Sequence, residues 1–231
     1  MNVNCCRTRL LRSRKVIFTK LSGIIQTYKD TLDYTTFGKE IEKHVTKILV
    51  AIFTDNRCIQ FEKDYKIAKD KNEFPDFLLL SVNPILAIEI KSGNRSKLKK
   101  GKWVPCNNSE NDMGTFNKWP EKLARFDGNN IIYIFIEYNF NSSDKKLVDI
   151  KIAPFYKFIG LTKAGFLKYR EKDGNLRPKD FDQAATIDSL EEFNALIPKT
   201  IIYRSARIIK KHWKNIPKSE RPKLIQDLIN N

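Results

Sequence analysis

The apolar residues of this chain follow two kinds of spacing, one typical of helices and one typical of strands. Over residues 37–53 they recur every three or four positions, which predicts an amphipathic helix with one buried face. Shorter apolar runs at residues 58–61, 76–80 and 85–90 have the length and composition of strands. The last two runs flank a turn signal at residues 81–84, so we expect them to pair as an antiparallel hairpin.

The second half of the chain adds a central strand and a basic helix. Residues 130–138 (NIIYIFIEY) carry too many apolar side chains for a half-exposed strand, which predicts a strand at the centre of a sheet. Residues 147–152 alternate and predict its neighbour, while residues 119–126 and 201–213 predict helices, the latter basic and amphipathic. Residues 92–117 are rich in Lys, Asn, Gly and Ser and predict an extended loop. This order of elements predicts an α/β protein with a mixed sheet.

Length and composition favour one globular domain that binds a polyanion. A chain of 231 residues, 41% hydrophobic and 30% charged, has the composition of a soluble protein and the length of a single domain over residues 1–231. We divide it into a basic N-terminal helical segment (1–33), a core (34–155) and a basic C-terminal helical part (156–231). The formal net charge of +16 indicates a polyanionic partner, and charge alone fits nucleic acid, an acidic membrane or an acidic protein. No apolar stretch approaches the roughly 20 residues that span a bilayer, and no strongly basic helix has a broad uninterrupted apolar face, so we expect no membrane partner.

The cysteines and the missing motifs exclude several classes of protein. The four cysteines lack the spacing of a zinc site, and a disulfide framework is not expected in a chain of this length. We therefore expect reduced thiols and a cytoplasmic location. No segment resembles a Gly-rich phosphate loop or a Ser/His/Asp triad, and we expect no small-molecule organic cofactor.

Three charged residues meet at one end of the predicted hairpin. Asp76 opens the first strand, and Glu89 and Lys91 close the second. Glu89 and Lys91 are two positions apart, so their side chains leave the same face of the strand, and the apolar residues beside them face the core. Two carboxylates so placed can hold Mg²⁺, which prefers oxygen ligands and keeps several waters. Hydrolysis of a phosphodiester needs such a metal together with a water made nucleophilic near neutral pH.

These residues resemble the signature of a known nuclease superfamily. Asp76, a spacer of twelve residues and then Glu89 and Lys91, with Pro75 ahead of them, is similar to the PD-(D/E)xK motif. The resemblance implies a restriction-endonuclease-like α/β core, in which a mixed central β-sheet of four or more strands is flanked by helices. The alternative interpretation is a pair of strand ends with solvated charges, because the three-residue signature is degenerate.

The resemblance also implies a further acidic residue on the helix that precedes the hairpin. Gly38 is followed four positions later by Glu42, a spacing that is similar to this element in restriction and mismatch-repair nucleases. We select Glu42 as a fourth catalytic residue because it borders the apolar face of its helix. Glu40 is the alternative.

Basic and polar residues beyond the motif are candidates for contacts with DNA. Cations bind phosphates, whereas Asn, Lys and the Thr methyl group match base edges. From the segment after Lys91 we select Arg95, Lys97, Lys99, Lys100, Lys102, Asn107, Asn108, Thr115, Asn117 and Lys118. The basic C-terminal helix adds Arg204, Arg207 and Lys211. A solvated Lys- and Asn-rich loop and a solvated helix face are the alternatives.

Together the motif, the charge and the polar loop predict a type II restriction endonuclease. We expect Asp76, Glu89 and the Ile90 carbonyl to hold Mg²⁺, and Lys91 to orient the water that cleaves double-stranded DNA and leaves 5′-phosphate ends. The resemblance implies a homodimer, because two symmetric sites are needed to cut both strands of a palindrome. Two alternatives stay open: a repair nickase or Holliday-junction resolvase of the same superfamily, and a non-catalytic DNA-binding protein.

Overall fold

A mixed β-sheet organises the structure, which is a computed structural model. The structure describes residues 2–27, 34–70, 73–94, 97–99, 102–104, 112–140, 145–179, 184, 186–213 and 215–223. Within these residues, five strands form one sheet in the order β1-β2-β3-β6-β7. Their bounds are β1 (Tyr65–Ile67), β2 (Phe77–Leu79), β3 (Leu86–Asn94), β6 (Ile131–Phe140) and β7 (Lys145–Pro154).

The pairing of the strands confirms the predicted hairpin and the predicted central strand. β2 and β3 are antiparallel, with Phe77 opposite Ile88. β6 runs parallel to β3 on one side and antiparallel to β7 on the other, so it lies inside the sheet. Every side chain of residues 131–139 is buried, as the continuous apolar run predicted.

Two predictions about strands and loops were wrong. Residues 58–61 form bends instead of a strand, and the edge strand β1 comes later. Cys58 and Ile59 are buried because they pack under the preceding helix, so burial produced the apolar run without a strand. The predicted loop of residues 92–117 is partly structured, since β3 extends to Asn94 and β4 (Lys97–Lys99) pairs with β5 (Lys102–Val104). These strands are lysine-rich and only three residues long each, too short for an alternating pattern to stand out.

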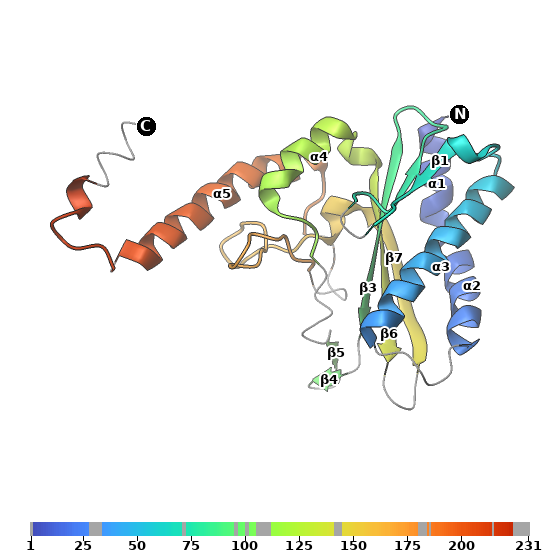
Figure 1. The fold of residues 1–231 in the computed structure, drawn as a ribbon, viewed down its shortest axis with the longest axis horizontal. Coiled ribbons are helices and arrows are strands. Elements are labelled where there is room, and N and C mark those ends of the chain that lie inside the picture. The colour runs from blue at the N-terminus through green and yellow to red at the C-terminus, as the bar shows by residue number, and fades with distance from the viewer. Residues whose placement is uncertain are drawn as a thin grey trace.

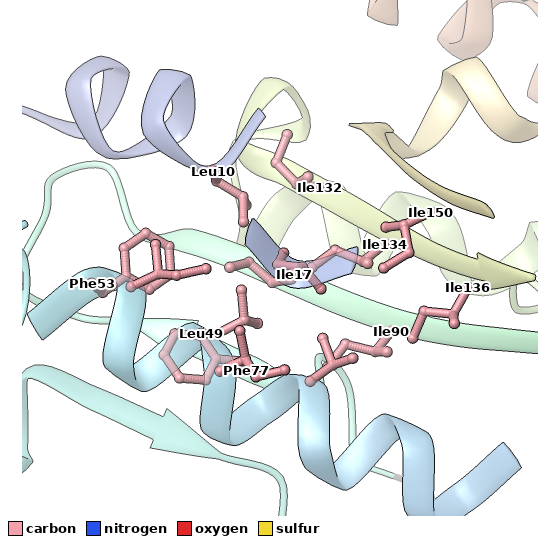
Figure 2. Packing of buried hydrophobic residues seen from close by; sticks show 14 of the residues in the cluster. Leu10, Ile17, Leu49, Phe53, Phe77, Ile90, Ile132, Ile134, Ile136 and Ile150 are labelled. Carbon is pink, nitrogen blue, oxygen red and sulfur yellow. The ribbon is translucent and has the colours of Figure 1, made fainter. Parts of the chain in front are cut away.

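Three helices cover one face of the sheet: α1 (Val3–Arg12), α2 (Arg14–Thr27) and α3 (Tyr34–Asp55). Figure 1 shows them on the same side of the strands, and Figure 2 shows the core between the two layers. Leu10 and Ile17 from α1 and α2 lie in this core beside Leu49 of α3 and Ile134 of β6. Each such side chain contributes roughly 1.5–3 kcal/mol by leaving water. The predicted helix over residues 37–53 is confirmed and is longer at both ends.

The N-terminal helices are also tied to the rest of the fold by polar contacts. Arg7 Nη1 donates to the Asn129 carbonyl at 3.1 Å, and Arg14 Nε donates to the Ile150 carbonyl at 2.7 Å. Arg14 also forms an ion pair with Asp149. The basic side chains of α1 and α2 therefore serve the packing of the fold as well as its charge.

One disulfide contradicts the expectation that the thiols are reduced. Cys6 of α1 is bonded to Cys58, which lies just after α3 and 52 positions away in the sequence. Nothing in the spacing of the cysteines indicates this pair, because only the packing of α1 against the end of α3 brings the two together. Among the described residues, Cys5 is a free and exposed cysteine.

The opposite face of the sheet carries an aromatic core and the remaining helices. Trp119 of α4 (Trp119–Arg125) stacks on Phe155 with ring centroids 4.1 Å apart, and Phe193 of α5 (Leu190–Trp213) meets Phe155 edge-on at 4.8 Å. The helix α4 was predicted, whereas α5 begins well before the predicted residue 201. Its first half includes Pro198, which reads as a helix breaker in the sequence. None of the described helices is both long enough and apolar enough to cross a membrane.

Candidate active site

The register of the β2–β3 hairpin brings Asp76 and Glu89 together. Asp76 directly precedes β2, and because Phe77 lies opposite Ile88, Asp76 faces Glu89 across the two strands. The Asp76 backbone N–H donates to Glu89 Oε2 at 3.3 Å, and the Ile90 N–H donates to Asp76 Oδ2 at 2.6 Å. The strand backbone thus holds both carboxylates in place at one end of the hairpin.

Lys91 completes this group from the same face of β3 as Glu89. Its Nζ donates to Glu89 Oε1 at 2.5 Å, and the two side chains are only 22% and 10% exposed. Ile88 and Ile90 are buried in the core under α3, as the alternation along the strand predicted. The structure therefore brings the three predicted motif residues into one cluster.

Glu42 approaches the cluster from α3 through Ser92. The Ser92 hydroxyl donates to Glu42 Oε1 at 2.8 Å. One helical turn earlier, a Cβ on Gly38 would lie 2.9 Å from Ser92 Oγ, so the glycine lets α3 come this close to β3. Glu40 lies at the surface and pairs with Lys43 at 2.6 Å. Of the two helix acids considered, the structure places Glu42 beside the hairpin.

The charges in this cluster shift one another's pKa values. Burial and the nearby Glu89 carboxylate raise the pKa of Asp76 from 3.8 to about 7, although Lys91 opposes the shift. Burial also raises the pKa of Glu42. Burial alone lowers the pKa of Lys91, but the surrounding carboxylates, led by Glu89, outweigh it and hold that pKa above its ordinary range. Lys91 is therefore an ammonium ion at neutral pH.

A cleft of about 700 Å³ opens beside Glu89, between the hairpin and α4. Lys122 of α4 lines this cleft, and its Nζ lies 3.6 Å from the centre of the Phe74 ring and 4.8 Å from that of Trp119. Burial lowers the pKa of Lys122 to about 8, with Glu89 opposing and Lys91 adding to the shift. Nothing in the sequence singled out Lys122, because only the fold brings α4 next to the hairpin.

Tyr133 of β6 is a second residue near the site that the sequence did not indicate. It lies opposite Glu89 in the register of β3 and β6 and is fully buried. Within the described residues, no hydrogen-bond partner reaches its hydroxyl. Burial, followed by Glu89 and Asp76, raises its pKa well above the ordinary value, so the hydroxyl stays protonated. In the sequence it is one more apolar position in a buried strand.

The predicted DNA-contacting residues fall into several places. Thr115 and Lys118 line the cleft beside Glu89, and Asn117 is exposed next to them. The strands β4 and β5 carry Lys97, Lys99 and Lys102, whose side chains lie outside the described part of the chain. Arg95, Lys100, Asn107 and Asn108 also lie outside the described residues.

The three predicted contacts on α5 line a separate cleft with Glu171. Arg207 forms an ion pair with Glu171 at 2.6 Å, and Arg204 Nη2 donates to the Glu171 carbonyl at 3.0 Å. Lys211 lies one turn further along the same face and is exposed. Two of these three cations are thus already engaged with the protein itself.

The segment that carries Thr115 and Lys118 is fixed to the rest of the fold. Arg170 Nη2 lies 2.8 Å from Asp112 Oδ2, at the start of the segment. Backbone hydrogen bonds join Met113 to Leu176 at 3.0 Å and Phe116 to Gly174 at 3.2 Å. This part of the predicted loop is therefore a wall of the cleft with a defined backbone.

The donor set of the cluster fits a hard divalent cation. Within the described residues, no group of three or more His, Cys, Asp and Glu side chains could hold a metal ion. The candidate side-chain donors in this cluster are the Asp76 and Glu89 carboxylates. Mg²⁺ is commonly bound by one or two carboxylates, with waters and substrate phosphates completing its shell. Burial and Glu89 raise the pKa of Asp76, so a cation bound beside it would favour its charged form, and the Tyr133 hydroxyl is a buried donor that a water or ligand oxygen can satisfy.

Comparisons with known proteins identify the fold. No protein-family model matches the chain, and no curated protein sequence matches it. Among solved structures 38 chains match, including the NlaIV restriction endonuclease, with a TM-score of 0.55 and 16% sequence identity over 87% of this chain and 85% of that one. The protein therefore has a restriction-endonuclease-like fold, and the predicted fold class is confirmed. At this level of identity the likeness defines the fold alone.

Proposed function

We propose that the protein is a type II restriction endonuclease that hydrolyses phosphodiester bonds of double-stranded DNA in a Mg²⁺-dependent reaction. The observation that carries this proposal is the meeting of Asp76, Glu89 and Lys91 at one end of the β2–β3 hairpin, beside an open cleft. The restriction-endonuclease-like fold and the net charge of +16 support a DNA substrate.

Each residue of the cluster has a distinct role in the proposed reaction. Asp76 and Glu89, with the Ile90 carbonyl as a further ligand, would hold the cation, which would supply charge stabilisation and lower the pKa of a bound water. Lys91, as an ammonium ion, donates hydrogen bonds that orient the attacking water and the scissile phosphate. The water oxygen bonds to phosphorus, the bond to the 3′ oxygen breaks, and that oxygen takes a proton. The products are a 5′-phosphate and a 3′-hydroxyl. Glu42 tunes the site through Ser92.

DNA is held by the wall of the cleft and by the basic surface around it. Thr115 and Lys118 lie close enough to Glu89 to contact a bound strand, because all three line the same cleft. Lys97, Lys99 and Lys102 stay assigned to phosphate contacts, and Asn117 stays assigned to base contacts. Arg204, Arg207 and Lys211 on α5 are assigned to the backbone farther from the site.

The proposed enzyme acts as a homodimer, and α5 offers a surface for the second copy. Ile202 is 69% exposed and Ile209 is 44% exposed. With Ala206 and Trp213 they follow spacings of four, three and four residues, which place them in one stripe along the helix. The face toward Glu171 carries the basic residues, so the stripe lies on the other side of α5. A self-complementary stripe of this kind suits a twofold contact.

We also propose that the protein is located in the cytoplasm. A restriction endonuclease meets its substrate in the cytoplasm, which is the location expected from the sequence. The disulfide between Cys6 and Cys58 is a bond that a reducing compartment opens, so in the cytoplasm the two thiols would be packed side by side without it.

Cleavage by purified variants tests the proposed reaction. With Mg²⁺ and phage DNA, the wild-type protein is expected to give discrete fragments whose ends carry 5′-phosphates. Asp76→Asn, Glu89→Gln and Lys91→Met are each expected to lower the rate by at least about 100-fold, because each removes a group that acts on the reacting atoms. Binding to the same DNA without metal should persist.

The matched control is Glu40→Gln, which removes a half-buried acid of α3 that pairs with Lys43 and should leave cleavage unchanged, whereas Glu42→Gln lowers it. Sequence-independent cutting of branched DNA would instead indicate a resolvase or a repair nickase. Binding without any cleavage when Mg²⁺ is supplied would indicate a non-catalytic DNA-binding protein. Unchanged cleavage by Asp76→Asn or Glu89→Gln would refute the assignment of the site.

A further inference from the structure

Lys122 presents a positive charge to the cleft beside the carboxylate pair. Its Nζ lies over the face of Phe74, which is two residues before Asp76, and close to the ring of Trp119. Within the described residues it forms no ion pair, so its charge is met by aromatic faces and by the open cleft. An ammonium ion held this way keeps its hydrogen-bond donors available to a ligand.

The surrounding chain is shaped to accommodate this ammonium ion. Gly114 has a φ of +85°, and a Cβ there would lie 2.9 Å from Lys122 Nζ. Any side chain at this position would therefore push into the lysine, besides straining the backbone. Trp119 is fixed in turn, because its Nε1 donates to the Met113 carbonyl at 3.2 Å. The lysine is placed by its neighbours on both sides of the cleft.

The charges around the carboxylate pair explain why a basic side chain is needed to bind a DNA phosphate in this cleft. Glu89 and Asp76 repel the phosphates of an approaching strand, and Lys91, which is hydrogen-bonded to Glu89, is assigned to the scissile phosphate and the water. Glu73 at the edge of the cleft is engaged by Lys66. Lys118, Lys122 and Arg125 line this cleft with Glu89, and Lys122 is the one whose ammonium group lies over Phe74, two residues before Asp76.

We propose that Lys122 is a phosphate-binding residue and that the cleft between Glu89 and α4 is the subsite that seats a backbone phosphate of the DNA beside the metal-binding pair. This inference rests on the proposed nuclease function for its substrate. Lys122 acts as a point charge in contact with a phosphate oxygen, and the Phe74 and Trp119 rings hold it in the required position. It positions the strand over Asp76 and Glu89.

Binding of duplex DNA in EDTA, measured by fluorescence anisotropy from about 50 to 300 mM salt, tests this inference without cleavage. Lys122→Met keeps the aliphatic stem and removes the charge. Its affinity should fall on the order of tenfold, the loss of one charge-assisted hydrogen bond. The slope of log Kd against log salt concentration should decrease by about 0.9, because binding of the variant releases one counterion fewer. Lys122→Arg keeps the charge and should keep the wild-type slope.

Lys63 offers a matched control, because its Nζ lies 5.5 Å from the centre of the Phe61 ring and it does not line the cleft. Lys63→Met should leave the slope unchanged. Lys122→Gln provides a second neutral variant if Lys122→Met fails to fold, and the melting temperature of each variant reports folding independently. A wild-type slope in a folded neutral variant overturns the inference, and so does a wild-type protein that does not bind duplex DNA.

The outcome is separable from that of the proposed function. A changed slope in the Lys122 variants of a protein that never cleaves DNA would support the phosphate subsite and refute the nuclease. An unchanged slope in a protein that cleaves DNA would refute the subsite and leave the nuclease intact.

Discussion

At the scale of single residues, the cluster at the hairpin end is electrostatically costly in the absence of a cation. The pKa of Asp76 is about 7 in the folded protein because burial and Glu89 disfavour its charged form, whereas the ordinary value is 3.8. Between pH 3.8 and about pH 7, Asp76 keeps its proton in the folded protein and has lost it in the unfolded chain. Asp76 therefore contributes stability that is full below about pH 4 and is lost as the pH rises through 7.

This sign gives a prediction for Asp76→Asn. In EDTA the variant should be more stable than the wild type at pH 8, on the order of 2–4 kcal/mol, because it lacks the buried charge. At pH 4 the difference should disappear. Urea unfolding at pH 4 and pH 8 measures this difference in the free energy of unfolding. Glu40→Gln is the control, because it removes an acid of α3 outside the cluster. Equal pH dependence in the variant and the wild type would contradict the prediction. Mg²⁺ at pH 8 should stabilise the wild type only.

The residue scale also separates what the sequence could predict from what it could not. Asp76, Glu89 and Lys91 were predicted because they lie on two strands joined by a short turn, so local spacing determines their meeting. Lys122 and Tyr133 reach the same place from elements far along the chain, and no periodicity connects them with the motif. Their positions depend on tertiary packing.

At the scale of elements, the contact of α3 with β3 links the fold to the site. Gly38 permits the close approach, and the hydrogen bond from Ser92 to Glu42 holds the helix in register with the strand. The helix was predicted from the spacing of its apolar residues. The spacing of Gly38 and Glu42 pointed to an acidic residue of this helix beside the hairpin. The disulfide between Cys6 and Cys58 and the edge strand β1 were not predicted, since both depend on how separate elements pack.

The variant Gly38→Ala tests this contact. A methyl group 2.9 Å from Ser92 Oγ must displace the hydroxyl that binds Glu42, and we expect this cost to outweigh the gain in helix propensity of about 1 kcal/mol. We expect a net loss of roughly 1–3 kcal/mol in the free energy of unfolding, with lower cleavage activity. Removal of the hydroxyl in Ser92→Ala should relieve part of the clash in the double variant. A double-mutant cycle by urea unfolding measures this coupling, which additive losses would contradict.

At the scale of the whole molecule, the described surface combines basic faces with an exposed apolar stripe on α5. The described residues around the cleft and along α5 include several of the cations that give the chain its net charge of +16. In Figure 1, α5 extends away from the sheet, so its second half stands clear of the body of the protein. Its apolar stripe through Ile202 and Ile209 is left uncovered by the described residues of the chain. The net charge was visible in the sequence, but the projection of this helix was not.

The uncovered stripe predicts the assembly of the protein. If two copies pair along α5, a charge in the stripe must be desolvated at the contact, which costs several kcal/mol and breaks the dimer. Ile202→Asp is therefore expected to convert the protein from dimer to monomer, as measured by sedimentation velocity, without lowering its melting temperature in dilute solution. Ser205→Asp adds the same charge to an exposed position off the stripe and should leave the dimer intact. A wild-type monomer at micromolar concentration, or a dimer that survives Ile202→Asp, would show that α5 is not the dimer contact.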